Sequence, residues 1–523
     1  MPLTDPDEVF YAETAREMLD RDEFLTPYIF GEPQFEKPPL YYWLILISFK
    51  ALGVNEFSAR LPSALLGILG IIGIYLLGKL FVNKKVGFFS ALMLLTSAFF
   101  LVLARACVID MLLGVSILYV FLFFFYGKFS SSGKTKYYLL SAVFLALATL
   151  AKGPIGIFLP VATIGIYLIA TRDLRSLKEI PIFRGIAILF LISAPWYFLM
   201  YKAHGKEFID MFFGFHNITR FIHPEHAWGD TFYYYAPVFL AGFLPWSIFL
   251  PVAAWVAFTE KDEKIKKANV FFITWFLVTF LFFSLSRTKL PTYIFPIFPA
   301  VALFTGRLWD SYSGEGRQKL HKSIRISLYI FLAALIGGIV AFYVVSRVRY
   351  PAIAGSVLFY GGIFLVLITI FVVALSKKHY AVSLAAFMAA FTMLAISLSY
   401  KILPEIGRYE SSKVVSLKLM ELATPEEIIG AETQYRRGVA FYTGREDVPD
   451  VHKHHIITTL LSKPERVWCV IKEKNHIQLY SDPKRHYYKP TYVIYQLGKK
   501  VILTNNPPAG VPILKVRTKD EPY

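Results

Sequence analysis

The sequence predicts a mainly α-helical, polytopic membrane protein with about 12 transmembrane helices and a small α/β domain at its C-terminal end. Of its 523 residues, 56% are hydrophobic and 17% are aromatic, and the mean hydropathy is +0.50. A soluble fold has too little interior for so many apolar side chains. Apolar windows of roughly 18–25 residues recur along the chain, and each is long enough to cross a hydrocarbon core of about 30 Å.

Residues 1–59 form a polar segment that we expect to be an extracytoplasmic loop with two short helices. Residues 7–20 place apolar side chains along one side at helical spacing, which indicates an amphipathic helix. Residues 39–52 begin with Pro39, a residue favoured at helix N-termini. Their aromatic content is typical of a helix that lies in the membrane interface.

Residues 60–400 are predicted to form the transmembrane domain. Two short spans meet at Lys152-Gly153-Pro154, which predicts a hairpin with a polar tip. The predicted spans are 60–82, 86–103, 108–127, 137–152, 154–171, 180–201, 233–257, 269–286, 290–308, 323–345, 352–376 and 380–400.

Basic residues are distributed unevenly between the loops. About 21 Lys and Arg residues lie in one set of alternate short loops and about nine in the other, and the richer set is expected on the cytoplasmic side. This asymmetry places residues 1–59, 202–232 and 401–523 together on the extracytoplasmic side. It also explains the net charge of +18 without a nucleic-acid partner, and we expect none.

Residues 401–523 alternate helix-like and strand-like segments, which predicts a soluble periplasmic α/β domain. We expect helices at 411–423 and 433–442 and strands at 427–431, 466–472 and 491–498. The two cysteines, Cys107 and Cys469, predict neither a metal pair nor a disulfide framework.

Unusual polar residues collect on the predicted extracytoplasmic side, at the membrane surface or one turn inside it. A charge is costly there unless it has a function. These residues are Glu36, Lys37, Arg105, Asp110, Lys152, His216, Arg220 and Tyr293. We interpret Arg105 and Asp110 as a structural ion pair near the surface.

Asp7 and Lys37 each fit two interpretations. Asp7, beside Glu8, stands at the start of the helix 7–20, where an acidic residue caps a helix or acts as a general base next to an embedded substrate. Lys37 is either an interfacial lysine whose ammonium reaches the headgroups or a clamp for a lipid phosphate, to which lysine offers a compact charge.

The segment 216–226 contains three histidines and Arg220 between aromatic residues. Three histidines invite a zinc site, but the His-Glu-x-x-His spacing is absent and an ordinary interfacial loop is the alternative. Arg220 is a candidate second phosphate ligand. Tyr293 is either an aromatic-belt residue or a hydroxyl donor to the same phosphate.

The sequence contains no Walker loop and no Gly-rich dinucleotide turn. A soluble nucleotide is therefore not the expected energy source, and an activated lipid is the natural alternative.

Four segments carry a family resemblance: residues 7–18 (DEVFYAETAREM), 35–43 (FEKPPLYYW), 58–62 (SARLP) and 289–293 (KLPTY). They resemble the bacterial branch of the protein O-mannosyltransferase superfamily, which includes the aminoarabinose transferase of lipid A. The similarity in span layout covers most of residues 1–400.

The resemblance implies the GT-C membrane fold and transfer of a sugar from a polyprenyl (undecaprenyl) phosphate on the periplasmic side of the inner membrane. The acceptor would be lipid A or another envelope glycolipid. By this resemblance Asp7, with Glu8 beside it, matches the catalytic aspartate, and Glu36 with His216 matches a zinc pair. Lys37, Arg220 and Tyr293 match ligands of the lipid phosphate.

Two departures from the family pattern are visible. The family often has an arginine where Phe10 stands, so one phosphate-facing cation is missing and phosphate binding must depend on Lys37 and Arg220. Family members also carry a span before the acidic loop, so we expect a thirteenth helix upstream of Met1.

Two other functions compete with lipid modification. The first is transfer by the same fold to Ser or Thr of proteins, because acceptor choice lies in loops without a readable code. The second is a transporter or flippase, a class that often shows repeated halves and charges near the bilayer midplane. Neither a repeat nor midplane charge is evident in the sequence.

Overall fold

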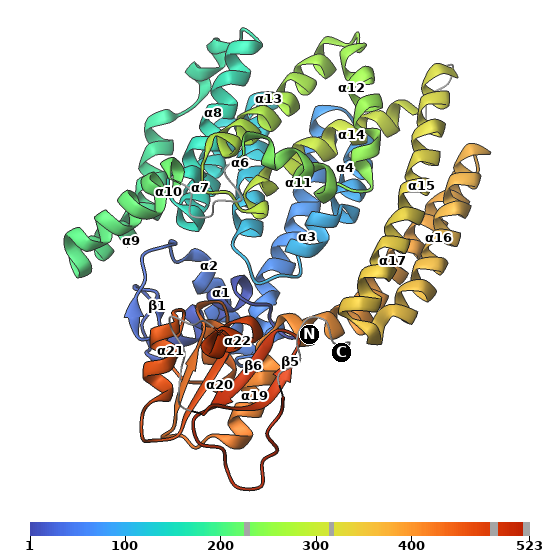
Figure 1. The fold of residues 1–523 in the computed structure, drawn as a ribbon. Helices are drawn as coiled ribbons and strands as arrows, with labels where there is room; N and C mark the ends of the chain where they lie inside the picture. Colours follow the sequence, from blue (N-terminus) through green and yellow to red (C-terminus); the bar gives the residue numbers. More distant parts are fainter. Residues whose placement is uncertain (224–230, 313–317, 482–489, 516–523) are drawn as a thin grey trace.

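The computed structural model describes residues 1–223, 231–312, 318–481 and 490–515. Most of the chain is helical, and a four-stranded sheet lies near its C-terminal end, which confirms the predicted fold class. Figure 1 shows a helical body, an adjoining group made of α15, α16 and α17, and an α/β domain at one end of the molecule. The N-terminal helices α1 and α2 lie between the helical body and the α/β domain.

The N-terminal segment forms helix α1 (Asp7–Asp20), a two-stranded hairpin (β1, Tyr28–Ile29; β2, Glu32–Pro33) and helix α2 (Leu40–Leu52). Both predicted helices are confirmed. The amphipathic prediction for α1 is wrong, because every residue from Glu8 to Met18 is buried. Its polar side is satisfied internally: the Arg16 guanidinium donates to Glu13 at 2.7 and 2.8 Å and to Asp20 at 2.7 Å.

Among the residues that the structure describes, seven helices are long and apolar enough to cross a membrane, or eight if one bent pair counts as a single span. The predicted number of twelve spans is not confirmed. The long apolar helices are α3 (Glu56–Phe81), α6 (Asp110–Phe129), α9 (Ile182–Ile209), α13 (Glu263–Leu285), α15 (Gln318–Arg349), α16 (Ala354–Ser376) and α17 (Tyr380–Ser397).

Three predicted spans are interrupted rather than continuous. Proline explains two of the breaks, because it lacks a backbone donor and disrupts helical hydrogen bonding: Pro245 lies at a bend of 104°, and Pro291 opens a 3₁₀ turn. The third break falls at Ser97. The resulting pieces are α4 (Lys84–Thr96) with α5 (Ala98–Leu103); η4 (Phe232–Tyr234), α11 (Tyr235–Gly242), η5 (Trp246–Phe249) and α12 (Leu250–Phe258); and η6 (Pro291–Ile297) with α14 (Phe298–Tyr312).

The predicted hairpin between two short spans is confirmed. Helix α7 (Lys134–Lys152) ends at Gly153, whose φ of +73° suits a residue without a side chain, and α8 (Ile155–Ala170) follows Pro154. The 3₁₀ turn η1 (Leu174–Glu179) then leads to α9.

The segment after α9 differs from the expected loop 202–232. Helical structure continues beyond residue 201 through the π-helix η2 (Asp210–Thr219) and the short α10 (Arg220–Ile222). The aromatic side chains of this segment explain the difference, because Phe208 and Phe212 pack in a buried cluster with Phe35 and Trp196.

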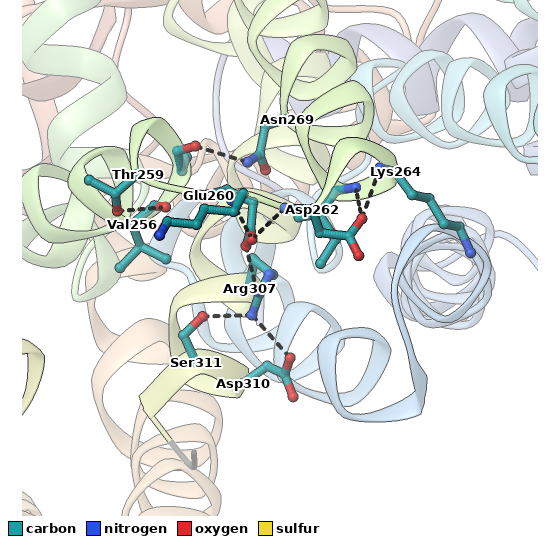
Figure 2. Close-up of polar contacts among 12 residues, drawn as sticks. Val256, Thr259, Glu260, Asp262, Lys264, Asn269, Arg307, Asp310 and Ser311 are labelled. Atoms are coloured by element: carbon teal, nitrogen blue, oxygen red, sulfur yellow. Dashed lines mark hydrogen bonds and ion pairs between the residues drawn. The ribbon is translucent and has the colours of Figure 1, made fainter. Parts of the chain in front are cut away.

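A buried polar network joins α12, α13 and α14 (Figure 2). The Arg307 guanidinium donates to Glu260 at 2.6 Å, to Asp310 at 3.1 Å and to Ser311 at 2.6 Å. The carboxylate of Asp262 caps α13 by accepting from the first backbone amides of that helix. The network anchors the loop 259–262 to α14.

The C-terminal α/β domain follows α17 through the π-helix η8 (Leu398–Ile402) and α18 (Leu403–Glu410). Its sheet has the strand order β3-β4-β6-β5, with β3 and β4 parallel and the other neighbours antiparallel. The strands are β3 (Ile428–Ala431), β4 (Val467–Lys472), β5 (Tyr492–Leu497) and β6 (Lys500–Thr504), and the helices are α19 (Lys413–Leu422), α20 (Thr433–Thr443), α21 (His454–Leu461) and α22 (Glu473–Ser481).

All five elements predicted in this tail are present within a few residues of the expected bounds. The prediction missed α21, α22 and β6. Strand β6 pairs with β5 across a tight turn in which Gly498 has a φ of +57°. Because only two residues separate β5 from β6, the two strands resemble one apolar segment in the sequence, and β6 was therefore missed.

Candidate functional site

Asp7 is the first residue of α1 and lies where the N-terminal segment meets the helical body. Its side chain is solvent-exposed, yet surrounding protein desolvates the carboxyl group and raises its pKa above the ordinary value. The charge of Arg437 opposes this rise, whereas the carboxylates of Asp110 and Glu36 add to it.

Glu36 brings two predicted phosphate ligands together. Its Oε1 atom accepts from the Lys37 ammonium at 3.1 Å and from the Arg220 guanidinium at 2.8 Å. Burial alone would raise the pKa of Glu36, but the two cations outweigh it and lower that pKa well below its ordinary value. The carboxylate is therefore ionised and holds both cations in place.

Backbone contacts attach Arg220 to the segment that leads to Tyr293. The carbonyl of Arg220 accepts from the Thr288 amide at 3.2 Å, and the carbonyl of Phe221 accepts from the Arg287 amide at 3.0 Å. Segments some 70 residues apart in the chain are thereby aligned. Their pairing explains how Arg220 and Tyr293 contribute to one site.

Lys152 forms the second cationic centre. Its ammonium lies 2.6 Å from the Oδ1 atom of Asp110 and 4.2 Å from the ring centroid of Tyr293. Both charged side chains are about 90% buried. Lys152 and Lys37 lie close enough for each charge to act on the other, so the two cationic centres border one region.

The predicted ion pair between Arg105 and Asp110 is wrong. Asp110 pairs with Lys152 instead, and the Arg105 guanidinium donates to the hydroxyl of Ser399. Spacing in the sequence suggested the wrong partner because residues 104–109 form a turn between two helices rather than a single helical turn.

Glu8, predicted beside Asp7 in the catalytic pair, is fully engaged by its neighbours. Its carboxylate accepts two hydrogen bonds from the Arg60 guanidinium, both at 2.7 Å, and one from the Cys107 amide at 2.9 Å. The amide and hydroxyl of Thr4 each donate a further bond at 2.9 Å. Because Glu8 is only 4% exposed, we assign it the role of an anchor for the N-terminal segment and remove it from the proposed catalytic set.

The structure brings the two members of the predicted metal pair, Glu36 and His216, together, and the metal itself stays a prediction. The two side chains lie close enough for the Glu36 charge to act on the imidazole. The Nδ1 atom of His216 is buried and has no hydrogen-bond partner among the described residues. No group of three metal-ligating side chains occurs within that same part of the chain. Of the other two histidines of the segment, His223 directly follows α10, and His226 lies outside the described residues.

Three members of the site had no predicted functional role. Asp110 was expected only in a structural pair with Arg105 and Lys152 only at the tip of a hairpin, although a buried acid and a buried lysine at the ends of apolar helices are themselves a signal of function. Arg437 lies in the C-terminal domain, about 430 positions after Asp7. Local sequence patterns do not connect residues so far apart.

A family model, sequence relatives and solved structures all relate this chain to membrane glycosyltransferases. The family model described as dolichyl-phosphate-mannose-protein mannosyltransferase matches residues 36–198. An uncharacterized protein of Aquifex aeolicus is 31% identical over 442 residues, which cover 84% of this chain and 82% of that protein.

A named relative from Erwinia tasmaniensis, undecaprenyl phosphate-alpha-4-amino-4-deoxy-L-arabinose arabinosyl transferase, is 29% identical over 359 residues. The match spans 68% of this chain and 64% of the relative's length. Among solved structures, ArnT from Cupriavidus metallidurans bound to undecaprenyl phosphate superposes with a TM-score of 0.79 at 23% identity, covering 97% of this chain and 94% of that one. At this identity the likeness concerns the fold.

The motifs of the first loop, the layout of the helices and the comparisons agree. The chain belongs to the dolichyl-phosphate-mannose-protein mannosyltransferase family and is an integral membrane glycosyltransferase of the GT-C fold, as the resemblance implied.

Proposed function

We propose that the protein transfers a sugar from a polyprenyl phosphate, of the undecaprenyl class, to lipid A or another envelope glycolipid at the periplasmic face of the inner membrane. The observation that carries this proposal is the convergence of Lys37, Arg220, Lys152 and Tyr293 around the carboxylates of Glu36 and Asp110 beside Asp7. The donor named for the arabinosyl transferase relatives supports the lipid.

The cations suit a phosphate leaving group. During transfer the bond between the anomeric carbon and the phosphate oxygen breaks, and negative charge builds on the lipid phosphate. Fixed cations stabilise that charge more in the transition state than in the ground state. Glu36 and Asp110 hold Lys37, Arg220 and Lys152 in position before the donor binds, so little reorganisation is needed.

Asp7 is proposed as the general base. It would accept the proton of the acceptor hydroxyl while the acceptor oxygen bonds to the anomeric carbon. Burial raises the pKa of Asp7, and a carboxylate with a raised pKa is a stronger base than an ordinary aspartate. Its solvent exposure leaves room for an acceptor.

Glu36 and His216 are the residues that would hold a zinc ion. One carboxylate and one imidazole are fewer ligands than a closed structural site provides, so substrate or water oxygens would complete the coordination. The bound ion would add positive charge next to the donor phosphate.

Transfer from radiolabelled undecaprenyl-phosphate sugars by the reconstituted protein tests the site. Asp7→Asn should lower kcat by about 10²–10⁴-fold, the usual contribution of a general base. Lys37→Ala should weaken transfer by about 10–100-fold because it removes a charge-assisted hydrogen bond. Asp22→Asn, an exposed acid in the same segment, is the matched control.

The pH profile provides a second readout of Asp7. Because the base must be ionised, the rate should rise with pH through a pKa that lies above the ordinary aspartate value, and Asp7→Asn should remove this limb. Normal transfer by both Asp7→Asn and Lys37→Ala would show that the site is assigned wrongly.

Transfer to Ser or Thr of proteins is the second candidate, favoured by the match of residues 36–198 to a protein mannosyltransferase model. Mass spectrometry of lipid A and of secreted proteins from a deletion strain distinguishes the two. Loss of a sugar from proteins alone would favour the second.

A further inference from the structure

The C-terminal domain contacts the N-terminal segment that carries Asp7 (residues 1–59, here called the catalytic segment), and the main contact is the packing of α20 on α1 (Figure 1). Several bonds hold the two parts together: the Leu3 amide donates to the Tyr442 hydroxyl at 2.7 Å, and Arg21 pairs with Glu446 at 2.5 Å. Lys413 of the neighbouring α19 pairs with Glu56 at 2.5 Å.

Gly438 makes this approach possible. A Cβ atom at this position would overlap the Oδ1 atom of Asp5 and lie 2.9 Å from the Cβ atom of Ser412. The backbone of α20 therefore lies directly against the loop that precedes Asp7. The residue before Gly438 is Arg437, whose side chain consequently leaves the helix close to the site.

The Arg437 guanidinium lies 4.7 Å from the ring centroid of Phe10 and is the cation that acts most strongly on Asp7. It also acts on the hydroxyl of Tyr42, as the Glu36 charge does. The side chain is half-buried. In the described part of the chain it makes neither a hydrogen bond nor an ion pair.

Arg436, the preceding residue, behaves differently. Its guanidinium lies 3.6 Å from the ring centroid of Phe30 and donates to the carbonyl of Val448 at 2.5 Å. Arg436 thus stabilises the C-terminal domain. Arg437 lies beside Asp7, and its donors are available to a ligand.

Each cation of the site lies next to one of three carboxylates. Glu36 holds Lys37 and Arg220, and Asp110 holds Lys152. Asp7 faces Arg437, which approaches without bonding to it. A guanidinium has five N–H donors in a planar fork that matches phosphate oxygens, so an arginine with available donors at a polyprenyl-phosphate site points to a phosphate ligand.

We propose that Arg437, delivered by the C-terminal domain, is a phosphate-binding residue of the active site. The phosphate belongs either to the donor headgroup or to a phosphorylated acceptor, and no covalent change occurs at Arg437. The guanidinium lies over the ring of Phe10 on α1, so the C-terminal domain places a cation against the helix that carries Asp7. This inference rests on the proposed function.

The test compares Arg437→Ala and Arg437→Lys with the wild-type protein in reconstituted transfer. Arg437→Ala should raise the KM of one substrate by about 10–100-fold, the usual effect of losing a charge-assisted hydrogen bond to phosphate. Arg437→Lys should recover part of the loss because it restores the charge but not the fork. An increase for the labelled undecaprenyl-phosphate sugar assigns the donor phosphate, and an increase for lipid A but not for its dephosphorylated form assigns the acceptor phosphate.

Arg436→Ala is the matched control: it should lower the thermal midpoint of the detergent-solubilised protein and leave both KM values within about twofold. Unchanged KM values for both substrates in Arg437→Ala would overturn the proposal while the wild-type protein remained active. If the wild-type protein transferred no sugar from any prenyl donor, the proposed function itself would fail instead.

Discussion

At the scale of single residues, three nearby glutamates and aspartates have different properties because their partners differ. Glu8 accepts five hydrogen bonds and is enclosed. Glu36 is held ionised by two cations, and Asp7 is exposed with a raised pKa. Residue type alone does not separate a structural acid from a reactive one. The number and charge of the surrounding donors do.

Glu8→Gln should destabilise the protein without altering the affinity for the donor. The change leaves the Arg60 guanidinium, whose side chain is 14% exposed, without its counter-charge, and breaking a buried pair costs about 3–5 kcal/mol. Thermal unfolding in detergent measures the loss. Glu446→Gln, which breaks a half-exposed pair, should cost about 0–1 kcal/mol. If Glu8→Gln lost transfer activity at unchanged stability, Glu8 would be a catalytic residue after all.

At the scale of elements, the site is built where helices end or break. Lys152 is the last residue of α7, Asp110 is the first of α6, and His216 lies in a π-helix. Tyr293 lies in the 3₁₀ turn η6 that precedes α14. Such interruptions expose backbone and polar side chains at a defined depth, and they are tolerated in membrane proteins where protein or a polar cavity surrounds them.

Gly156→Ala should disturb the α7–α8 hairpin and, through it, Lys152. A Cβ atom at position 156 would overlap the backbone of Ala148 on α7, and overpacking of this kind typically costs about 1–3 kcal/mol. We expect a lower thermal midpoint together with weaker donor binding. Gly165→Ala on the same helix is the control, because no atom lies within 4 Å of its added Cβ. Equal behaviour of the two variants would contradict the close packing.

At the scale of the whole molecule, the C-terminal domain and the catalytic segment share a polar interface centred on Asp5. The Ser412 hydroxyl donates to Asp5 at 2.5 Å, and the other carboxylate oxygen is buried without a hydrogen bond in the described structure. Burial raises the pKa of Asp5 to about 7, although the Ser412 bond and the Lys500 charge oppose the rise. The interface therefore favours the protonated acid.

The raised pKa of Asp5 makes the stability of the contact between the C-terminal domain and the N-terminal segment depend on pH. The pKa of Asp5 is higher in the folded protein than in the unfolded chain, so its contribution is fully present below about pH 4 and is lost as pH rises through about 7. The side chain of Asp5→Asn stays neutral at every pH. The variant should therefore flatten the decline in the free energy of unfolding between about pH 5 and 8, by an amount on the order of a few kcal/mol, and the decline in thermal midpoint with it. Glu426→Gln, exposed on the same domain, should leave the decline intact, and an unchanged decline in Asp5→Asn would show that another group is responsible.

Composition, hydropathy and local motifs were sufficient for the membrane class, the family, the α/β tail and the polar face, because these depend on periodicity and on residues close together in the chain. Asp7, Lys37, Arg220 and Tyr293 could be singled out in this way. The pairing of Asp110 with Lys152, the anchoring role of Glu8 and the approach of Arg437 could not. Each depends on contacts between segments tens to hundreds of residues apart, and the energy of a buried charge is set by those distant partners rather than by its neighbours in sequence.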